Sequence, residues 1–237
     1  MFLPRRIGGL LLLMVCLACN NKDTFMFPEP ASPAVKAQYT YLALGDSYTI
    51  GESVATESRW TYFLANYLRQ AGVDIANPTT IAHTGWTTAE LQAAIRQSNT
   101  AITYDLVTLL IGVNNQYRGQ SLETYRSEFR ELLQTSVNFA AGKPGHVLVL
   151  SIPDWGVTPF AQGQNQTKIT QEIEAFNAIA QEECVQAHIT FVDITPVSRK
   201  AFQDDSYVAA DNLHFSGKMY AEWAALAYPL AQEILKK

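Results

Sequence analysis

Short apolar runs alternate with longer amphipathic segments along most of this 237-residue chain. The runs predict five strands, because apolar stretches bounded by turn residues are typical of buried strands. The intervening segments carry apolar residues at helical spacing, which predicts a helix after each strand. The expected strands cover residues 41–45, 73–81, 106–111, 146–152 and 189–194, and the expected helices cover residues 58–71, 87–97, 121–140, 166–187 and 216–237.

This alternation favours one fold class. A helix between two neighbouring strands is the usual crossover that makes those strands parallel. Helices on both faces of apolar parallel strands give an α/β fold, a three-layer α/β/α sandwich around a doubly wound five-stranded sheet. In such a sheet the turns after Leu44, Ala82, Ile111 and Ile152 lie at one edge, where open α/β sheets place their binding sites.

The first residues have the composition of an export signal. Arg5 and Arg6 precede an apolar stretch at residues 7–18, which is too short for an ordinary membrane-spanning helix. We therefore expect residues 1–19 to form a signal peptide. Leu17, Ala18 and Cys19 resemble the end of a bacterial lipobox, so Cys19 is the expected lipidation site and the lipid the only expected membrane contact. Cys16 departs from the usual branched aliphatic residue, which leaves plain secretion as the alternative.

Residues 20–38 contain three prolines among small and polar residues and show no periodicity, so we expect a flexible tether. Residues 39–237 are then long enough for one domain with a substantial core. We expect this domain to face the periplasm or the cell surface.

Charge and cysteine content exclude some classes of protein. The net charge is −5, and removal of Arg5 and Arg6 with the signal peptide takes it to −7, which argues against nucleic acid as a partner. Cys184 would be the only cysteine left in the domain, so no internal disulfide is expected. Its neighbours at helical spacing are apolar, which favours a core residue.

Ser47 follows Gly45 and Asp46 at the end of the first expected strand. A serine hydroxyl at this place can act as a nucleophile if a base is brought to it. Histidine suits that role because its charge changes near neutral pH. Among the chain's four histidines, His214 has Asp211 three residues earlier, so one short turn can hold the carboxylate against the imidazole.

Four blocks of residues follow the expected strands or precede the last helix. Ser47, Gly85, Asn114 and the pair Asp211 and His214 occur in the order found in SGNH (GDSL-type) esterases and lipases, and the chain resembles that family over nearly the whole expected domain. The resemblance implies a flavodoxin-like SGNH hydrolase fold with a Ser47, Asp211 and His214 triad. It also implies that the backbone N–H groups of Ser47 and Gly85 and the Asn114 amide form an oxyanion hole, without cofactor or metal. Tyr48 replaces the leucine for which the GDSL motif is named.

Substrate is less constrained by the sequence. Trp86 and Trp155 lie in loops at the expected active edge, where tryptophan can contact an acyl group or a sugar ring. We expect an enzyme that hydrolyses carboxylic esters of short to medium acyl chains, with O-acetyl groups on glycans as one option. A lysophospholipase, a thioesterase or an acyltransferase with the same triad remain alternatives, as does a non-catalytic glycan-binding module.

Overall fold

The computed structural model describes residues 37–98 and 102–236. The expected signal peptide, Cys19 and nearly all of the tether lie outside the described residues. Five strands form one parallel sheet in the order β2-β1-β3-β4-β5, which confirms the predicted doubly wound topology. The strands are β1 (Tyr41–Gly45), β2 (Thr79–Ala82), β3 (Leu106–Leu110), β4 (Val147–Leu150) and β5 (Thr190–Val192).

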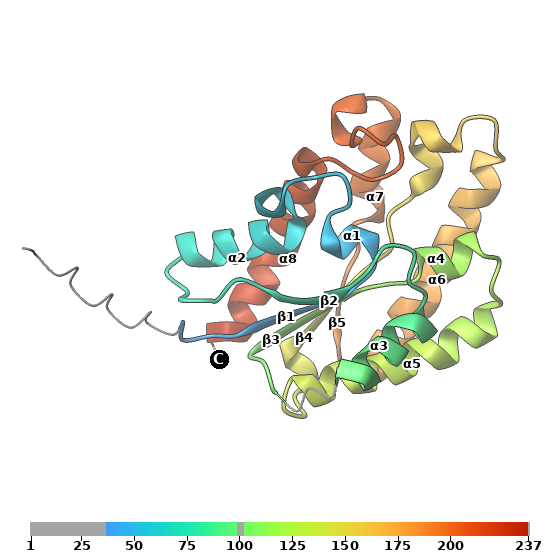
Figure 1. Ribbon diagram of the computed structural model, residues 1–237. Helices are drawn as coiled ribbons and strands as arrows, with labels where there is room; N and C mark the ends of the chain where they lie inside the picture. The colour runs from blue at the N-terminus through green and yellow to red at the C-terminus, as the bar shows by residue number, and fades with distance from the viewer. Residues whose placement is uncertain (1–36, 99–101, 237) are drawn as a thin grey trace, which may run out of the picture. The chain divides into compact units, whose positions relative to one another are not determined.

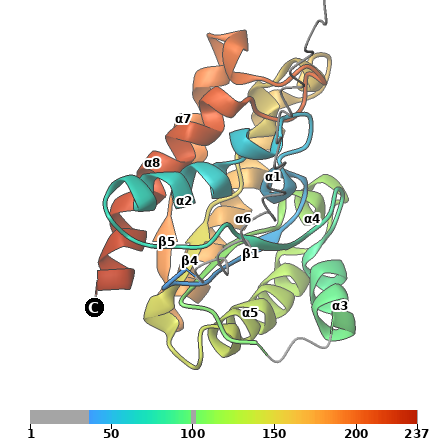
Figure 2. The ribbon, with the colours of Figure 1, turned by 60° about the vertical axis from the view of Figure 1, so that its left-hand side comes forward.

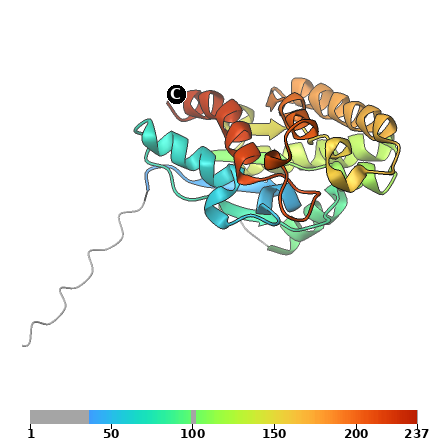
Figure 3. The ribbon, with the colours of Figure 1, turned by 90° about the horizontal axis from the view of Figure 1, so that it is seen from above.

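Helices cover both faces of the sheet, as Figures 1 and 2 show. On one face α2 (Trp60–Gln70) packs along α8 (Gly217–Lys236), and Figure 3 shows the two side by side from above. On the other face α5 (Leu122–Phe139) lies between α3 (Thr88–Ser98) and α6 (Gln166–Gln186). The expected three-layer sandwich is therefore present.

The core follows the apolar pattern of the sequence. Every residue of β1, β3 and β4 is buried, because helices cover these central strands on both faces. Helix α5 buries Tyr125, Phe129, Leu132 and Leu133, and Leu122 in its first turn is 39% exposed. Within the described residues, no helix is both long enough and apolar enough to cross a membrane.

The second strand differs most from its predicted bounds. The second strand begins only at Thr79, and Ile75 contributes one isolated bridge to Tyr39. Pro78 lacks the N–H that a continuous ladder would need, which explains the interruption. After β1 come the four-residue helix α1 (Ser47–Ile50) and a 3₁₀ turn (Thr56–Ser58). The short helices α4 (Val113–Tyr117) and α7 (Thr195–Ser198) follow β3 and β5.

Candidate active site

Ser47 is the first residue of α1, directly beyond the carboxyl end of β1. The Asp46 side chain caps this helix by accepting a hydrogen bond from the Tyr48 N–H at 3.0 Å. Asp46 is therefore the N-cap residue of α1. The Ser47 hydroxyl is not used for capping, and Ser47 lines a pocket. Only glycine fits at position 45, because a Cβ there would lie 2.2 Å from the Thr49 hydroxyl.

His214 and Asp211 are paired as the sequence predicted. Nδ1 of His214 lies 2.7 Å from Oδ2 of Asp211. The other carboxylate oxygen accepts the backbone N–H groups of Leu213 and His214 at 3.0 and 2.9 Å. The turn thus fixes the carboxylate, and a proton on Nδ1 leaves Nε2 of His214 free to accept one.

Ser53 is a further partner of the Asp211 carboxylate. Its hydroxyl donates to Oδ2 at 2.6 Å, across 158 positions of sequence. Burial raises the pKa of Asp211, but the hydrogen bonds from Ser53, Leu213 and His214 outweigh it and lower the pKa to about 2. The carboxylate therefore stays ionised at neutral pH and can stabilise a positive imidazole.

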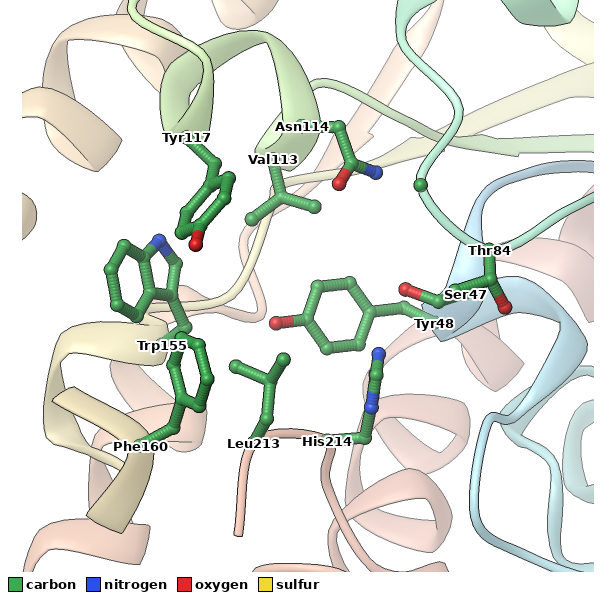
Figure 4. Close-up of a pocket in the computed structure, with 11 residues that line it drawn as sticks. Ser47, Tyr48, Thr84, Val113, Asn114, Tyr117, Trp155, Phe160, Leu213 and His214 are labelled. Carbon is green, nitrogen blue, oxygen red and sulfur yellow. The ribbon is translucent and has the colours of Figure 1, made fainter. Parts of the chain in front are cut away.

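Ser47 and His214 line one pocket, and Figure 4 shows the imidazole directed toward the serine. Both residues are nearly buried, with 5% and 7% of their surface exposed. No hydrogen bond joins their side chains in the described part of the chain. Such contacts are often long in a free enzyme and shorten once substrate is bound.

Gly85 lies in the turn after β2, on the same edge of the sheet. Its φ of 83° falls in the left-handed region that glycine adopts most readily. The Gly85 carbonyl accepts a hydrogen bond from Arg118, and the Thr84 hydroxyl donates to the carboxylate of Glu52. Within residues 37–98 and 102–236, the backbone N–H groups of Ser47 and Gly85 have no acceptor.

Asn114 is in α4, which begins two residues after β3 reaches the edge of the sheet. Its Nδ2 donates to the Trp86 carbonyl at 2.9 Å, which joins α4 to the Gly85 turn. An amide nitrogen carries two hydrogens, so one remains for a second acceptor. Ser47, Gly85 and Asn114 all line the same pocket, which is the placement that the family resemblance implied.

The pocket has a volume of about 190 Å³ and mostly apolar walls. Trp155, directly after the β4 edge turn, is 3% exposed and donates its indole N–H to Gln116 at 2.8 Å. Phe160 and Tyr117 flank it, with ring centroids 5.9 and 5.6 Å from the indole. Figure 4 shows the wall that is made of Tyr48, Val113, Tyr117, Trp155, Phe160 and Leu213.

The two tryptophans selected from the sequence lie in different places. Trp155 lines the pocket, as expected. Trp86 is not among the lining residues; its indole stacks on His83 with ring centroids 5.4 Å apart and packs partly against the core. Trp86 is joined to the site through its carbonyl, which accepts the hydrogen bond from Asn114.

Several residues of the site were not identified from the sequence. Tyr117 lies three positions after Asn114, so helical spacing could have placed both on one face. Glu52 and Ser53 give no such indication, because their partners are distant in the sequence.

Cys184 is buried in α6, and burial raises the pKa of its thiol to about 12, as expected of a core residue. The described residues contain no cluster of three or more His, Cys, Asp or Glu side chains suited to a metal ion.

The model of the GDSL-like lipase/acylhydrolase family matches residues 43–222. The chain therefore belongs to this family, and membership implies that it is an ester hydrolase. No curated protein matches the chain.

Solved structures share the fold at low sequence identity. TesA aligns over 82% of this chain and 99% of its own, with 20% identity and a TM-score of 0.64. A lipase/acylhydrolase from Enterococcus faecalis aligns over 82% and 96%, with 21% identity and a TM-score of 0.63. A variant of Axe2, an acetyl-xylooligosaccharide esterase from Geobacillus, aligns over 86% and 96%, with 15% identity and a TM-score of 0.61.

Proposed function

We propose that this protein is a serine esterase that hydrolyses carboxylic esters of short to medium acyl chains through an acyl-enzyme. The observation that carries the proposal is the 2.7 Å contact of His214 with Asp211 in a pocket that Ser47, Gly85 and Asn114 also line. This arrangement supplies a nucleophile, a base with a fixed tautomer, and donors for an oxyanion.

In the proposed reaction, Oγ of Ser47 attacks the ester carbonyl carbon while Nε2 of His214 takes the hydroxyl proton. The negative charge that forms on the carbonyl oxygen is stabilised by the N–H groups of Ser47 and Gly85 and by the Asn114 amide. The alcohol leaves with the proton held by His214. Water then attacks the acyl-enzyme and passes one proton to His214; the bond between Oγ of Ser47 and the acyl carbon breaks, His214 returns that proton to Oγ, and the acid is released.

The size of the pocket supports short to medium acyl groups. A cavity of roughly 150 Å³ is enough for a benzene ring, so about 190 Å³ accommodates a group only slightly larger. Trp155 is fixed by its hydrogen bond to Gln116 and closes the far side. A long acyl chain, as a lysophospholipase or thioesterase would require, has no comparable space inside this pocket.

Acetylated glycans are a second candidate substrate. Tyr117 and Phe160 are 58% and 41% exposed beside the pocket, and exposed aromatic rings are suited to stacking on sugar rings. Hydrolysis of acetylated xylo-oligosaccharides, with p-nitrophenyl acetate as the reference ester, tests this candidate. A kcat/KM no higher for the glycan would argue against it, and product analysis would reveal acyl transfer to an acceptor other than water.

The nucleophile is tested by Ser47→Ala, with Ser127→Ala as the control at an exposed serine of α5. Ester hydrolysis should fall by several orders of magnitude in the first variant and stay at the wild-type rate in the second. A fluorophosphonate probe should label the wild type and the control but not Ser47→Ala. If Ser47→Ala is folded and keeps a tenth of the activity, Ser47 is not the nucleophile.

We further propose that the protein is exported and anchored through a lipid on Cys19, on the sequence pattern of residues 1–19. Cells expressing the full chain should incorporate radiolabelled palmitate, and Cys19→Ser should abolish the label and release the protein from the membrane. Equal labelling of the wild type and of Cys19→Ser would exclude Cys19 as the lipidation site.

A further inference from the structure

Tyr48 follows the proposed nucleophile and carries a side chain for which the mechanism above has no use. Its ring is 2% exposed and packs against three aromatic rings. The ring centroids of His214, Phe215 and Trp223 lie 5.5, 5.8 and 6.0 Å away. With these rings packed around it, the phenol side chain extends across the pocket.

The hydroxyl of Tyr48 is directed into the pocket. Figure 4 shows the phenol oxygen between Val113 and Leu213, facing the wall that contains Trp155. No residue within 37–98 and 102–236 forms a hydrogen bond with it. The indole N–H of Trp155, in that wall, is already bonded to Gln116.

A phenol in such a place is a neutral donor. Burial, followed by the nearby charge of Asp46, raises the pKa of Tyr48 well above its usual value near 10. The hydroxyl thus keeps its proton at neutral pH. A donor that opens into a pocket without a protein acceptor is satisfied by water or by a ligand.

We propose that Tyr48 binds the substrate, and that its hydroxyl donates a hydrogen bond to an oxygen atom in the acyl group. The pocket then selects short acyl groups that contain an ether, keto or hydroxyl oxygen over plain alkyl groups of equal length. A site built to bond a substrate oxygen discriminates against the analogue without it, since the donor would be left unpaired. This inference rests on the proposed esterase function.

The test compares pairs of p-nitrophenyl esters that differ by one oxygen. Methoxyacetyl is paired with butanoyl, 3-methoxypropanoyl with pentanoyl, and 4-oxopentanoyl with pentanoyl, which places the oxygen at three distances from the ester carbonyl. The ratio of kcat/KM within each pair is measured for the wild type and for Tyr48→Phe. Because both enzymes use the same esters, intrinsic reactivity cancels in the comparison.

For at least one pair, Tyr48→Phe should lower the preference for the oxygen-bearing ester about tenfold, which is the size expected for one lost hydrogen bond. Tyr62→Phe is the matched control, since Tyr62 is a half-buried tyrosine of α2 that does not line this pocket. Its ratios should stay within twofold of the wild type. Tyr48→Leu gives a second variant without a hydroxyl, which should lose the same preference.

Unchanged ratios for all three pairs in both Tyr48 variants would overturn the inference. That result leaves the esterase proposal intact as long as the wild type hydrolyses the plain alkyl esters and Ser47→Ala does not. If the wild type hydrolyses none of the esters, the esterase proposal itself fails.

Discussion

The hydroxyl of Ser53 and the imidazole of His214 share one acceptor, the Oδ2 atom of Asp211, at 2.6 and 2.7 Å. Ser53 reaches this position with a φ of 64°, in the left-handed region that costs a residue with a side chain about 1 kcal/mol. Local backbone strain of this kind often accompanies a functional constraint. Here it brings the loop after α1 to the Asp211 carboxylate of the proposed triad.

The first prediction separates activity from stability at this position. Ser53→Gly removes the hydroxyl and the strain, so kcat/KM should fall about tenfold while stability stays within about 1 kcal/mol of the wild type. Ser53→Thr keeps a hydroxyl but adds a β-branched side chain at positive φ, so it should be the less stable but more active variant. Steady-state kinetics and urea unfolding measure both rankings. An activity ranking that simply follows stability would make Ser53 a structural residue.

The second prediction concerns Asn114. Removing one oxyanion donor costs about 3 kcal/mol in the transition state, so Asn114→Ala should reduce kcat about 100-fold with little change in KM. The variant also removes the hydrogen bond to the part-buried Trp86 carbonyl. A raised KM at constant kcat would instead make Asn114 a contact to the ground-state substrate.

The third prediction follows from the buried carboxyl of Asp46. Burial raises its pKa from 3.8 to about 7, and one of its oxygens has no partner among the described residues. A raised pKa means that the folded state favours the protonated form. Its contribution to stability is therefore full below pH 4 and is lost as pH rises toward 7.

Asp46→Asn should remove this pH dependence. Between pH 4 and pH 8, the unfolding free energy of the wild type relative to the variant should fall by about 3 kcal/mol. For Asp205→Asn, at an exposed position, the unfolding free energy should change with pH in parallel with that of the wild type over the same range. Urea unfolding at several pH values measures these differences, and parallel curves for the wild type and Asp46→Asn would show that Asp46 is ionised in the folded state.

The sequence was sufficient for the fold because its strands differ sharply from its helices in apolar pattern. It also brought Asp211 and His214 together correctly, since the two residues are three positions apart in one turn. The family resemblance placed Ser47, Gly85 and Asn114, which come from separate strand ends that parallel pairing collects at one edge.

Side-chain direction in the loops could not be predicted in the same way. Trp86 and Trp155 are both loop tryptophans at the active edge, and no local pattern distinguishes them. The difference arises from tertiary partners, because the indole of Trp155 donates a hydrogen bond to Gln116 while the indole of Trp86 stacks on His83. Ser53 was missed for the same reason, since its partner Asp211 is distant in the sequence.

The last prediction uses that difference between the tryptophans. Each methylene buried in a fitted pocket contributes about 0.8 kcal/mol, so kcat/KM for p-nitrophenyl esters should rise with chain length until the pocket is full. For a pocket of about 190 Å³ we expect a maximum between acetyl and about hexanoyl and a steep fall beyond about octanoyl.

Trp155→Leu should move that maximum to longer chains, because it opens the far wall of the pocket, although the lost packing should lower stability by about 3 kcal/mol. Trp86→Leu is the matched control, since the same substitution off the pocket should leave the preferred chain length unchanged. A shift with Trp86→Leu but not with Trp155→Leu would mean that the acyl chain lies along the turn at residues 83–86. A wild-type maximum at dodecanoyl or longer would contradict the short-acyl proposal and favour a lysophospholipase, because the chain would then have to extend past Trp155 and over the exposed rings of Tyr117 and Phe160.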